Sequence, residues 1–258
     1  MKIVAIIQAR LGSTRLPNKV LKKIEGKTIL EHVIDRVKAA RRIDQVVVAT
    51  TVNKEDLAIV KICENAGIGV FCGSEEDVLD RYYQAARLFG ADQVVRITAD
   101  CPMIDPKVID AVIELHLKEN ADNTLNTLKE TYPDGEDVEV VKFGALKKAW
   151  QEAKLLSERE HVTPYIKNNP GMFKIINLEY WENLSEKRWT LDNAEDYELI
   201  SRIYKALYHN NALFGMEEIL AFLKNCPELE KINQHIARNE GYAKSLKEDR
   251  VVSNTGKI

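Results

Sequence analysis

A cluster of basic side chains near the start of the chain has the chemistry to bind phosphate groups. Arg10, Arg15 and Lys19 lie within residues 8–19, a segment without any acidic residue. Between these cations is a turn that offers backbone N–H groups and hydroxyls, from Gly12, Ser13 and Thr14. A polyphosphate needs both kinds of group, because its charge must be neutralised and its oxygens must accept hydrogen bonds. We interpret residues 8–19 as a polyphosphate site, with a solvated basic turn as the alternative.

Two carboxylates further along the chain are candidates to complete such a site. Asp100 follows the apolar run 93–98, and a Mg²⁺ ion that bridges phosphate oxygens needs a carboxylate at a strand end near the basic segment. The alternative role of Asp100 is that of a turn former ahead of Pro102. Asp192 has Glu195 three residues later, and on the residues alone this spacing favours a helix N-cap.

Arg81 is a further candidate for ligand binding. It lies near the start of a predicted helix that opens after residue 73, from where its side chain could reach a ligand over the edge of a sheet. The alternative is a surface ion pair with Asp77 or Asp80, which are close to it in sequence. The residues alone leave both interpretations open.

The elements that position these residues alternate regularly in the first half of the chain. The apolar runs predict buried strands at residues 3–7, 46–50, 69–72 and 93–98. Helical spacing and capping patterns predict helices at residues 29–37, 53–66, 73–90 and 105–115. Such alternation is typical of a largely parallel α/β layer, in which ligands bind at the carboxyl ends of the strands. We therefore expect residues 8–19 and Asp100 to meet at one edge of the sheet.

In the second half of the chain, the predicted strands and helices no longer alternate regularly. A strand of alternating apolar and acidic residues is predicted at 137–141, and another strand at 173–178. Helices are predicted at residues 145–154 and 157–168, from about 192 to 207, and at 216–223. The last residues, 249–258, are expected to fray.

Composition and missing motifs exclude several classes of function. With 258 residues and a net charge of -3, the chain fits one large α/β domain, or a domain with an appendage, and no global field draws it to nucleic acid or a membrane. The four cysteines form no Cys-x-x-Cys pair, and the five histidines form no metal-binding pair. Residues 8–19 match neither the P-loop nor the Gly-x-Gly-x-x-Gly pattern, and no nucleophilic serine motif is present. The N-terminus shows no signal peptide and no run has membrane-spanning length, so a cytoplasmic protein without membrane insertion is expected.

Three stretches together resemble a known family, namely residues 8–19, 96–102 and 188–192. The resemblance is to the spore coat polysaccharide biosynthesis protein F family of cytidylyltransferases, which is related to the 3-deoxy-manno-octulosonate and acylneuraminate enzymes. Further similar stretches are residues 73–82, 133–139 and 159–165. The resemblance runs from residue 1 to about residue 207, and the ordered set of motifs is more specific than any one of them.

The resemblance implies the fold, the domain organisation and the assembly. The fold would be an α/β, Rossmann-like, three-layer nucleotide-diphospho-sugar transferase fold with a mixed, mostly parallel sheet. Residues 1–207 would form the nucleotidyltransferase domain, including a dimerisation and sugar-binding arm at about 123–180. Residues 208–258 would form a C-terminal helical extension and tail. A homodimer is expected.

The resemblance also implies roles for individual residues. Catalytic roles fall to the cations of the basic segment and one carboxylate, Arg10, Arg15, Lys19 and Asp100. Asp100 and Asp192 would bind Mg²⁺. Substrate contacts are expected from Ala9, Leu11, Gly12, Ser13, Arg81 and Thr98, with the first four on the base and phosphates. The sugar pocket is expected around Asp137, Glu139, Arg159, Glu160, His161 and Tyr165.

The implied reaction is Mg²⁺-dependent transfer of CMP from CTP to an acidic sugar, with release of pyrophosphate, for surface polysaccharide or glycan synthesis. The octulosonate enzymes have Gln-Gly-Asp where this chain has Thr98-Ala99-Asp100, so guanylyl or other nucleotidyl transfer to a sugar phosphate is an alternative. A glycosyltransferase of the same broad fold is another, although such enzymes usually carry Asp-x-Asp and here Cys101-Pro102 follows Asp100. A third alternative is a non-catalytic scaffold that keeps the fold. The set Arg10, Arg15, Lys19, Asp100 and Asp192 argues against it, because a scaffold has no need of cations that face carboxylates.

Overall fold

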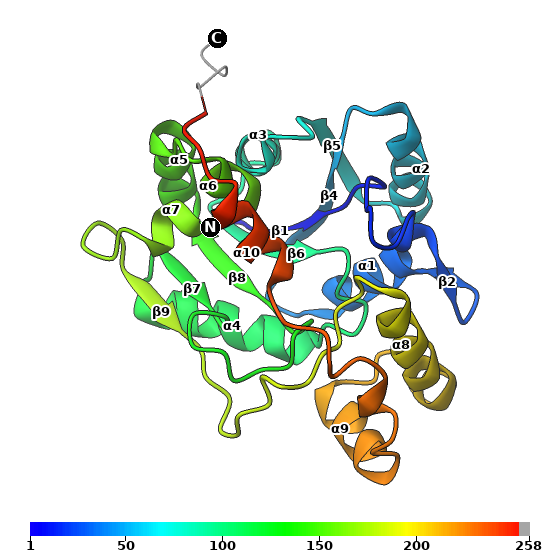
Figure 1. The fold of residues 1–258 in the computed structure, drawn as a ribbon. Coiled ribbons are helices and arrows are strands. Elements are labelled where there is room, and N and C mark those ends of the chain that lie inside the picture. The colour runs from blue at the N-terminus through cyan, green and yellow to red at the C-terminus, as the bar shows by residue number, and fades with distance from the viewer. Residues whose placement is uncertain (253–258) are drawn as a thin grey trace.

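A seven-stranded mixed sheet forms the centre of the computed structural model, which describes residues 1–252 (Figure 1). In spatial order its strands are β5 (Gly69–Gly73), β4 (Gln45–Thr51), β1 (Ile3–Gln8), β6 (Gln93–Thr98), β8 (Glu139–Lys142), β7 (Asn123–Leu125) and β9 (Ile175–Asn177). Only β8 runs antiparallel to its neighbours, β6 and β7. The other pairs are parallel. The prediction of a mixed, mostly parallel sheet is confirmed.

Helices cover both faces of the sheet and give three layers (Figure 1). One face packs on α1 (Ile29–Ala39), α2 (Leu57–Ala66) and α4 (Pro106–Glu119), and the other on α3 (Val78–Leu88), α5 (Phe143–Glu152) and α7 (Pro164–Lys167). In β1, Ile3, Ala5 and Ile7 belong to the first core, whereas Val4 and Ile6 belong to the second. This alternation follows from the two-residue period of a strand. It explains why the central strands are apolar throughout.

Local signals placed some of the helix ends in this half, whereas the helices expected from residues 53 and 73 begin only at Leu57 and Val78. Thr28 and Glu31 form the expected capping box at the start of α1. Gly67 ends α2 in the left-handed region, with φ 63°. Two 3₁₀ turns, η1 (Lys19–Leu21) and η2 (Lys54–Asp56), and a small hairpin of β2 (Lys23–Ile24) and β3 (Lys27–Thr28) complete this half.

The region 123–180 differs from the expectation in two respects. Residues 123–125, for which no strand was expected, form β7, so this region supplies three strands of the main sheet. The single helix expected at 157–168 is two short helices, α6 (Leu156–His161) and α7. Pro164 has no N–H to donate and clashes with a preceding helical turn, so the helix cannot continue across it. Val162, at the break, has a positive φ of 73°.

The C-terminal residues pack on the rest of the chain. α8 (Ala194–Leu207) and α9 (Met216–Asn225) join the first core, followed by η3 (Glu230–Ile232) and α10 (Glu240–Lys247). The expected fraying is wrong for residues 249–252, because Leu156 N–H donates to the Arg250 carbonyl at 2.9 Å and Val252 N–H donates to that of Lys154 at 2.8 Å. Residues 253–258 of that expectation lie outside the described part of the chain. None of the described helices is both long and apolar enough to cross a membrane.

His116 of α4 is a buried histidine with a structural role. Its Nε2 lies 2.9 Å from Gln93 Oε1, which can only accept, and its Nδ1 lies 3.0 Å from the Thr124 hydroxyl, which can donate. This arrangement fits the neutral ring. Burial, aided by the charge of Lys142, lowers the pKa of His116 to about 4.

This pKa predicts a loss of stability in acid that depends on His116. The unfolded chain takes up the proton near pH 6.5 and the folded chain only near pH 4, so the free energy of unfolding should fall as pH drops through this window. His116→Gln should remove up to about 3 kcal/mol of that pH dependence. Urea unfolding between pH 7.5 and 4.5 measures it, with His209→Gln, on an exposed side chain, as the control. Equal pH slopes for wild type and His116→Gln would contradict the assignment.

Candidate functional site

The basic segment forms a loop that Asp56 holds over the end of β1. The N–H of Leu11 donates to Asp56 Oδ1 at 2.9 Å, and the hydroxyls of Thr50 and Thr51 donate to Asp56 Oδ2. Asp56 is buried and follows β4, so the carboxyl ends of two neighbouring strands are tied together. The sequence reasoning did not single out Asp56. Asp56 therefore holds the loop in place at the carboxyl ends of β1 and β4.

Lys19 links this loop to both predicted carboxylates. Its Nζ donates to Asp100 Oδ2 at 2.7 Å and to Asp192 Oδ1 at 2.8 Å, and only 12% of its side chain is exposed. Burial opposes the charge, but the two carboxylates outweigh it and raise the pKa of Lys19. Burial likewise opposes the charge of Asp100, yet Lys19 lowers the pKa of this carboxyl to about 2. The predicted meeting of the basic loop with Asp100 and Asp192 is confirmed.

Asp192 reaches this position because it is not the helix cap. The residue that precedes α8 is Asn193, and Asp196 accepts hydrogen bonds from the N–H groups of Asp192 and Asn193, both at 2.9 Å. The N-cap interpretation of Asp192 is therefore wrong. Its carboxylate instead faces Lys19 and Arg15, whose Nη2 lies 3.0 Å away.

Arg188 is a site residue that the sequence reasoning missed. Its guanidinium donates to Asp196 Oδ1 and Asp134 Oδ2, both at 2.9 Å, and lies 3.4 Å from Asp192 Oδ2. Its side chain is only 5% exposed. The signal was present, because Arg188 precedes Asp192 by four residues in the same motif. The arginine fixes the orientation of the carboxylate that the motif presents.

Two cavities meet at these carboxylates. The first, which we call the loop cavity, has a volume of about 280 Å³ and is lined by Gln8, Ala9, Arg10, Gly12, Ser13, Thr14, Arg15, Lys19, Val20, Thr98, Ala99, Asp100 and Asp192. The second, the arm cavity, has about 530 Å³ and includes Asp137, Glu139 and His161. Both are lined by Arg15, Thr98, Asp100 and Asp192. A group bound in one cavity can therefore contact a group bound in the other.

The arm cavity contains charges of both signs. Glu139 lies 3.4 Å from Lys167 Nζ and 4.0 Å from Arg96 Nη1, and these two cations were not singled out from the sequence. The Nε of Arg96 is buried and has no hydrogen-bond partner among the described residues. Burial lowers the pKa of His161 to about 4 against the opposing charge of Glu160, so its ring is neutral near pH 7.

Some predicted residues lie elsewhere. Leu11 is buried and lines neither cavity. Arg81 is also buried, and its Nη1 donates to the carbonyl of Ser74. The alternative ion pair with Asp77 or Asp80 is not found among the described residues, since Asp77 is bound by Arg159 and Asp80 by Trp150 and Gln84.

Three of the six residues expected in the sugar pocket lie outside the arm cavity, and the hydrogen-bond partners of their side chains do not line it either. Arg159 is held by Asp77 and by the carbonyl of Trp150. Tyr165 donates its hydroxyl to Glu152. Glu160 accepts a hydrogen bond from Ser245 of α10. None of the three lines the arm cavity.

Asp100 and Asp192 have the donor chemistry for Mg²⁺. Within residues 1–252 no cluster of three or more His, Cys, Asp or Glu side chains is arranged to hold a metal. Mg²⁺ does not require one, because it commonly binds one or two carboxylates and takes its remaining ligands from water and substrate phosphates. The Lys19 ammonium between the two carboxylates marks a position where positive charge is already stabilised.

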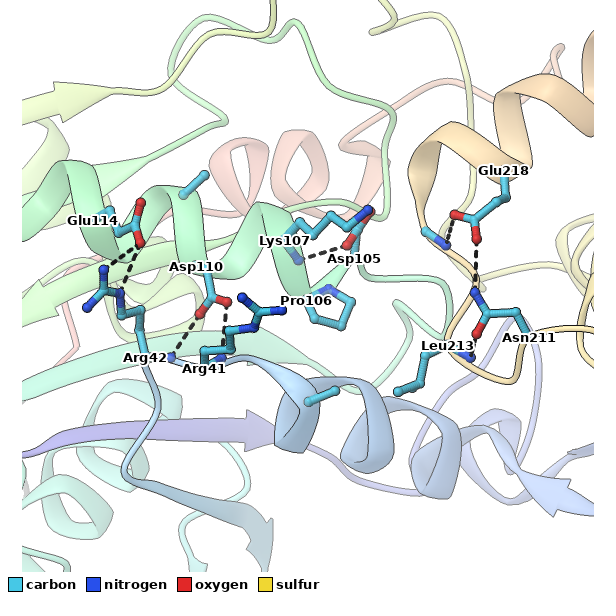
Figure 2. A pocket seen from close by; sticks show the side chains of 13 residues that line it. Arg41, Arg42, Asp105, Pro106, Lys107, Asp110, Glu114, Asn211, Leu213 and Glu218 are labelled. Carbon is cyan, nitrogen blue, oxygen red and sulfur yellow. Dashed lines mark hydrogen bonds and ion pairs between the residues drawn. The ribbon is translucent and has the colours of Figure 1, made fainter.

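A larger cavity, of about 700 Å³, lies between α1, α4 and the start of α9 (Figure 2). None of the predicted site residues lines it. Its carboxylates are already engaged, as Figure 2 shows: Asp110 accepts from the backbone N–H groups of Arg41 and Arg42, and Glu114 pairs with Arg42. The candidate site is therefore the pair of smaller cavities at the strand ends.

Comparison with known proteins identifies several similar chains. A family model described as cytidylyltransferase matches residues 4–251. An uncharacterised protein of Methanocaldococcus jannaschii is 43% identical over 94% of this chain and 98% of its own length. The spore coat polysaccharide biosynthesis protein SpsF of Bacillus subtilis is 33% identical over 79% of this chain and 86% of its own. The structure of a cytidylyltransferase from Leptospira borgpetersenii superposes with a TM-score of 0.85 at 33% identity, covering 89% of this chain and 96% of that one.

Proposed function

The chain belongs to the cytidylyltransferase family, and we propose that it transfers CMP from CTP to an acidic sugar with release of pyrophosphate, as a step in surface polysaccharide or glycan synthesis. The resemblance inferred from residues 8–19, 96–102 and 188–192 is confirmed, and with it an enzyme of the nucleotidyltransferase type. The nucleotide, the sugar and the metal ion are the parts that we propose.

The observation that carries the proposal is the junction of the two cavities. The loop cavity offers Arg10, Arg15 and Lys19 to a triphosphate, and the arm cavity offers a separate space to a second substrate. Asp100 and Asp192 line both. A phosphorus atom at this junction is open to an oxygen that approaches from the arm cavity, while pyrophosphate remains in the loop cavity. Such placement provides the in-line geometry that phosphoryl transfer requires.

The side chains of the loop cavity suit the charge changes of this reaction. The attacking sugar oxygen forms a bond to the α-phosphorus, the bond to the pyrophosphate oxygen breaks, and negative charge grows on the leaving group. Lys19 and Arg15 donate N–H groups to that charge, and Arg10 can leave its exposed pair with Glu75 at a cost of about 1 kcal/mol or less. Mg²⁺ held by Asp100 and Asp192 would supply further positive charge at the reacting phosphate.

The arm cavity supports an acidic second substrate. Arg96 and Lys167 line it, and the unpartnered Nε of Arg96 is a donor that a sugar carboxylate could satisfy. Cytidine is favoured by the family to which the chain belongs. Guanylyl transfer to a sugar phosphate, the homodimer, the division at residue 207 and the cytoplasmic location stay predictions.

The test is a pyrophosphate-release assay with CTP, GTP, UTP and ATP against a panel of sugar acids and sugar phosphates. We expect release with CTP and a sugar acid, and loss of release when EDTA removes divalent metal. Release only with GTP and a sugar phosphate would replace the proposed substrates. No turnover with any pair, together with no nucleotide binding in calorimetry, would refute the enzymatic function.

A further inference from the structure

Residues near the C-terminus line part of the candidate site. Five residues after η3 line the arm cavity, namely Ala237, Asn239, Glu240, Gly241 and Tyr242. We call residues 237–242 the wall segment. Figure 1 shows α10, in red, beside α6 and in front of the strands β6 and β8 in this view. Sequence reasoning gave this part of the chain no function, because the residues it contacts are far away in sequence.

The wall segment is anchored at both ends. Before it, Asn233 Nδ2 donates to the carbonyl of Arg188 at 3.0 Å and to Asp196 Oδ1 at 2.8 Å. After it, Arg250 and Val252 make the backbone bonds to the start of α6 described above, and Asp249 Oδ2 accepts the Ser157 hydroxyl at 2.8 Å. A segment with bonded ends holds a defined position over a cavity, unlike a free tail.

The wall segment and α10 contact three of the six residues predicted for the sugar pocket, namely Asp137, Glu160 and His161. Arg238 Nη2 donates to Asp137 Oδ1 at 2.7 Å. The ring of Tyr242 packs edge-on against His161, with centroids 4.9 Å apart, and the Ser245 hydroxyl lies 2.9 Å from His161 Nε2. The positions of Asp137 and His161 therefore depend on residues of the C-terminus.

The wall segment also contacts the loop cavity through one ion pair. Glu240 Oε2 lies 3.1 Å from Arg15 Nη1, while Arg15 Nη2 contacts Asp192. In the proposed function, Arg15 binds the triphosphate. A phosphate oxygen and the Glu240 carboxylate need the same donor and repel each other, so both cannot be bound to Arg15 at full strength.

We propose that the wall segment is part of the substrate site: Tyr242 shapes the cavity of the second substrate, and Glu240 competes with the triphosphate for Arg15. This inference rests on the proposed function. It adds specificity-determining residues from a region outside the motifs. The pair is partly exposed, with side-chain exposures of 39% for Arg15 and 47% for Glu240, so nucleotide binding can break it at low cost.

The first test measures nucleotide affinity and does not depend on the sugar. Glu240→Gln should bind CTP, in calorimetry with Mg²⁺, about two- to fivefold more tightly than wild type, because the competing charge is gone. CMP, which lacks the outer phosphates, should bind both proteins equally. The control is Glu248→Gln, which removes the same charge from an exposed pair with Lys244 after α10. Equal CTP affinity of the Glu240 and Glu248 variants would overturn the competition.

The second test separates the two substrates. Tyr242→Ala should raise the KM of the sugar acid that gives turnover about tenfold while the KM of CTP changes less than twofold, since the ring faces only the arm cavity. Leu246→Ala, on an exposed side chain of the same helix, is the control. An unchanged sugar KM in Tyr242→Ala would overturn the role of the wall segment. Absence of nucleotide binding by wild type would refute the proposed function itself, whereas normal wild-type binding with indifferent variants would refute only this inference.

Discussion

Asp100→Asn is expected to lower turnover about 10²–10³-fold or more, because it removes one of the two charged carboxylates at the junction of the cavities. Asparagine keeps the shape but loses the negative charge that holds a cation. The fold should persist, since it is the backbone carbonyl of Asp100 that accepts the N–H of Leu191 at 2.8 Å. Steady-state pyrophosphate release measures turnover, and thermal unfolding verifies the fold.

A matched control for this variant is Asp35→Asn. Asp35 lies on α1 and forms an exposed ion pair with Lys27, so the substitution likewise removes one carboxylate charge. Its turnover should equal that of wild type. Asp192→Asn should resemble Asp100→Asn, since both carboxylates contact the same ammonium. If Asp100→Asn turned over like the Asp35 control, Asp100 would have no place in catalysis.

Arg188→Met is expected to destabilise the fold by about 3–5 kcal/mol, because it leaves buried carboxylates without their shared cation. Asp196 is fully buried and Asp134 nearly so. Methionine fills similar volume, so lost packing contributes little. Urea unfolding at pH 8 measures the change, and Arg202→Met, in an exposed pair with Glu198 on α8, should cost less than about 0.5 kcal/mol.

The cost of Arg188→Met should also shrink as the pH falls. Burial and the charge of Asp137 already raise the pKa of Asp134 to about 7, although Arg238 and Arg188 oppose this. Without Arg188 the pKa rises further, so the folded state binds a proton that the unfolded state, titrating near 3.8, does not. The variant binds this proton at a higher pH than wild type, whose Asp134 binds it near pH 7, so the variant's deficit in free energy of unfolding shrinks as the pH falls from about 9 to about 7. A deficit independent of pH would place the loss in packing.

The first half of the site could be predicted because it depends on local pattern and strand direction. Buried strands read as apolar runs, and parallel neighbours place their carboxyl ends on one edge. Residues 8–19 and Asp100 follow such strands, so their meeting required no knowledge of distant contacts. The capping box of Thr28 and Glu31 is similarly local, and it was correct.

The remainder depends on contacts between residues distant in sequence. The spacing of Asp192 and Glu195 fits a cap as well as that of Asn193 and Asp196, and the contact of Asp196 with Arg188 that accompanies the second is not visible in the spacing. β7 is three residues long and has no distinct pattern. The bonds of residues 249–252 to α6 span nearly the whole second half, and no local signal encodes them.

Lys19 acts as an internal counterion for Asp100 and Asp192. The two carboxylates cannot accept a divalent cation at full strength until this ammonium has another anion to neutralise, and a phosphate chain in the loop cavity is such an anion. Metal and nucleotide should therefore bind with positive cooperativity, each increasing the affinity of the other by the same factor. Calorimetric titration of either ligand with and without the other measures this coupling, and independent binding would contradict it. Under the proposed function, the resting charge balance of the protein would thus disfavour a metal ion that arrives without its nucleotide.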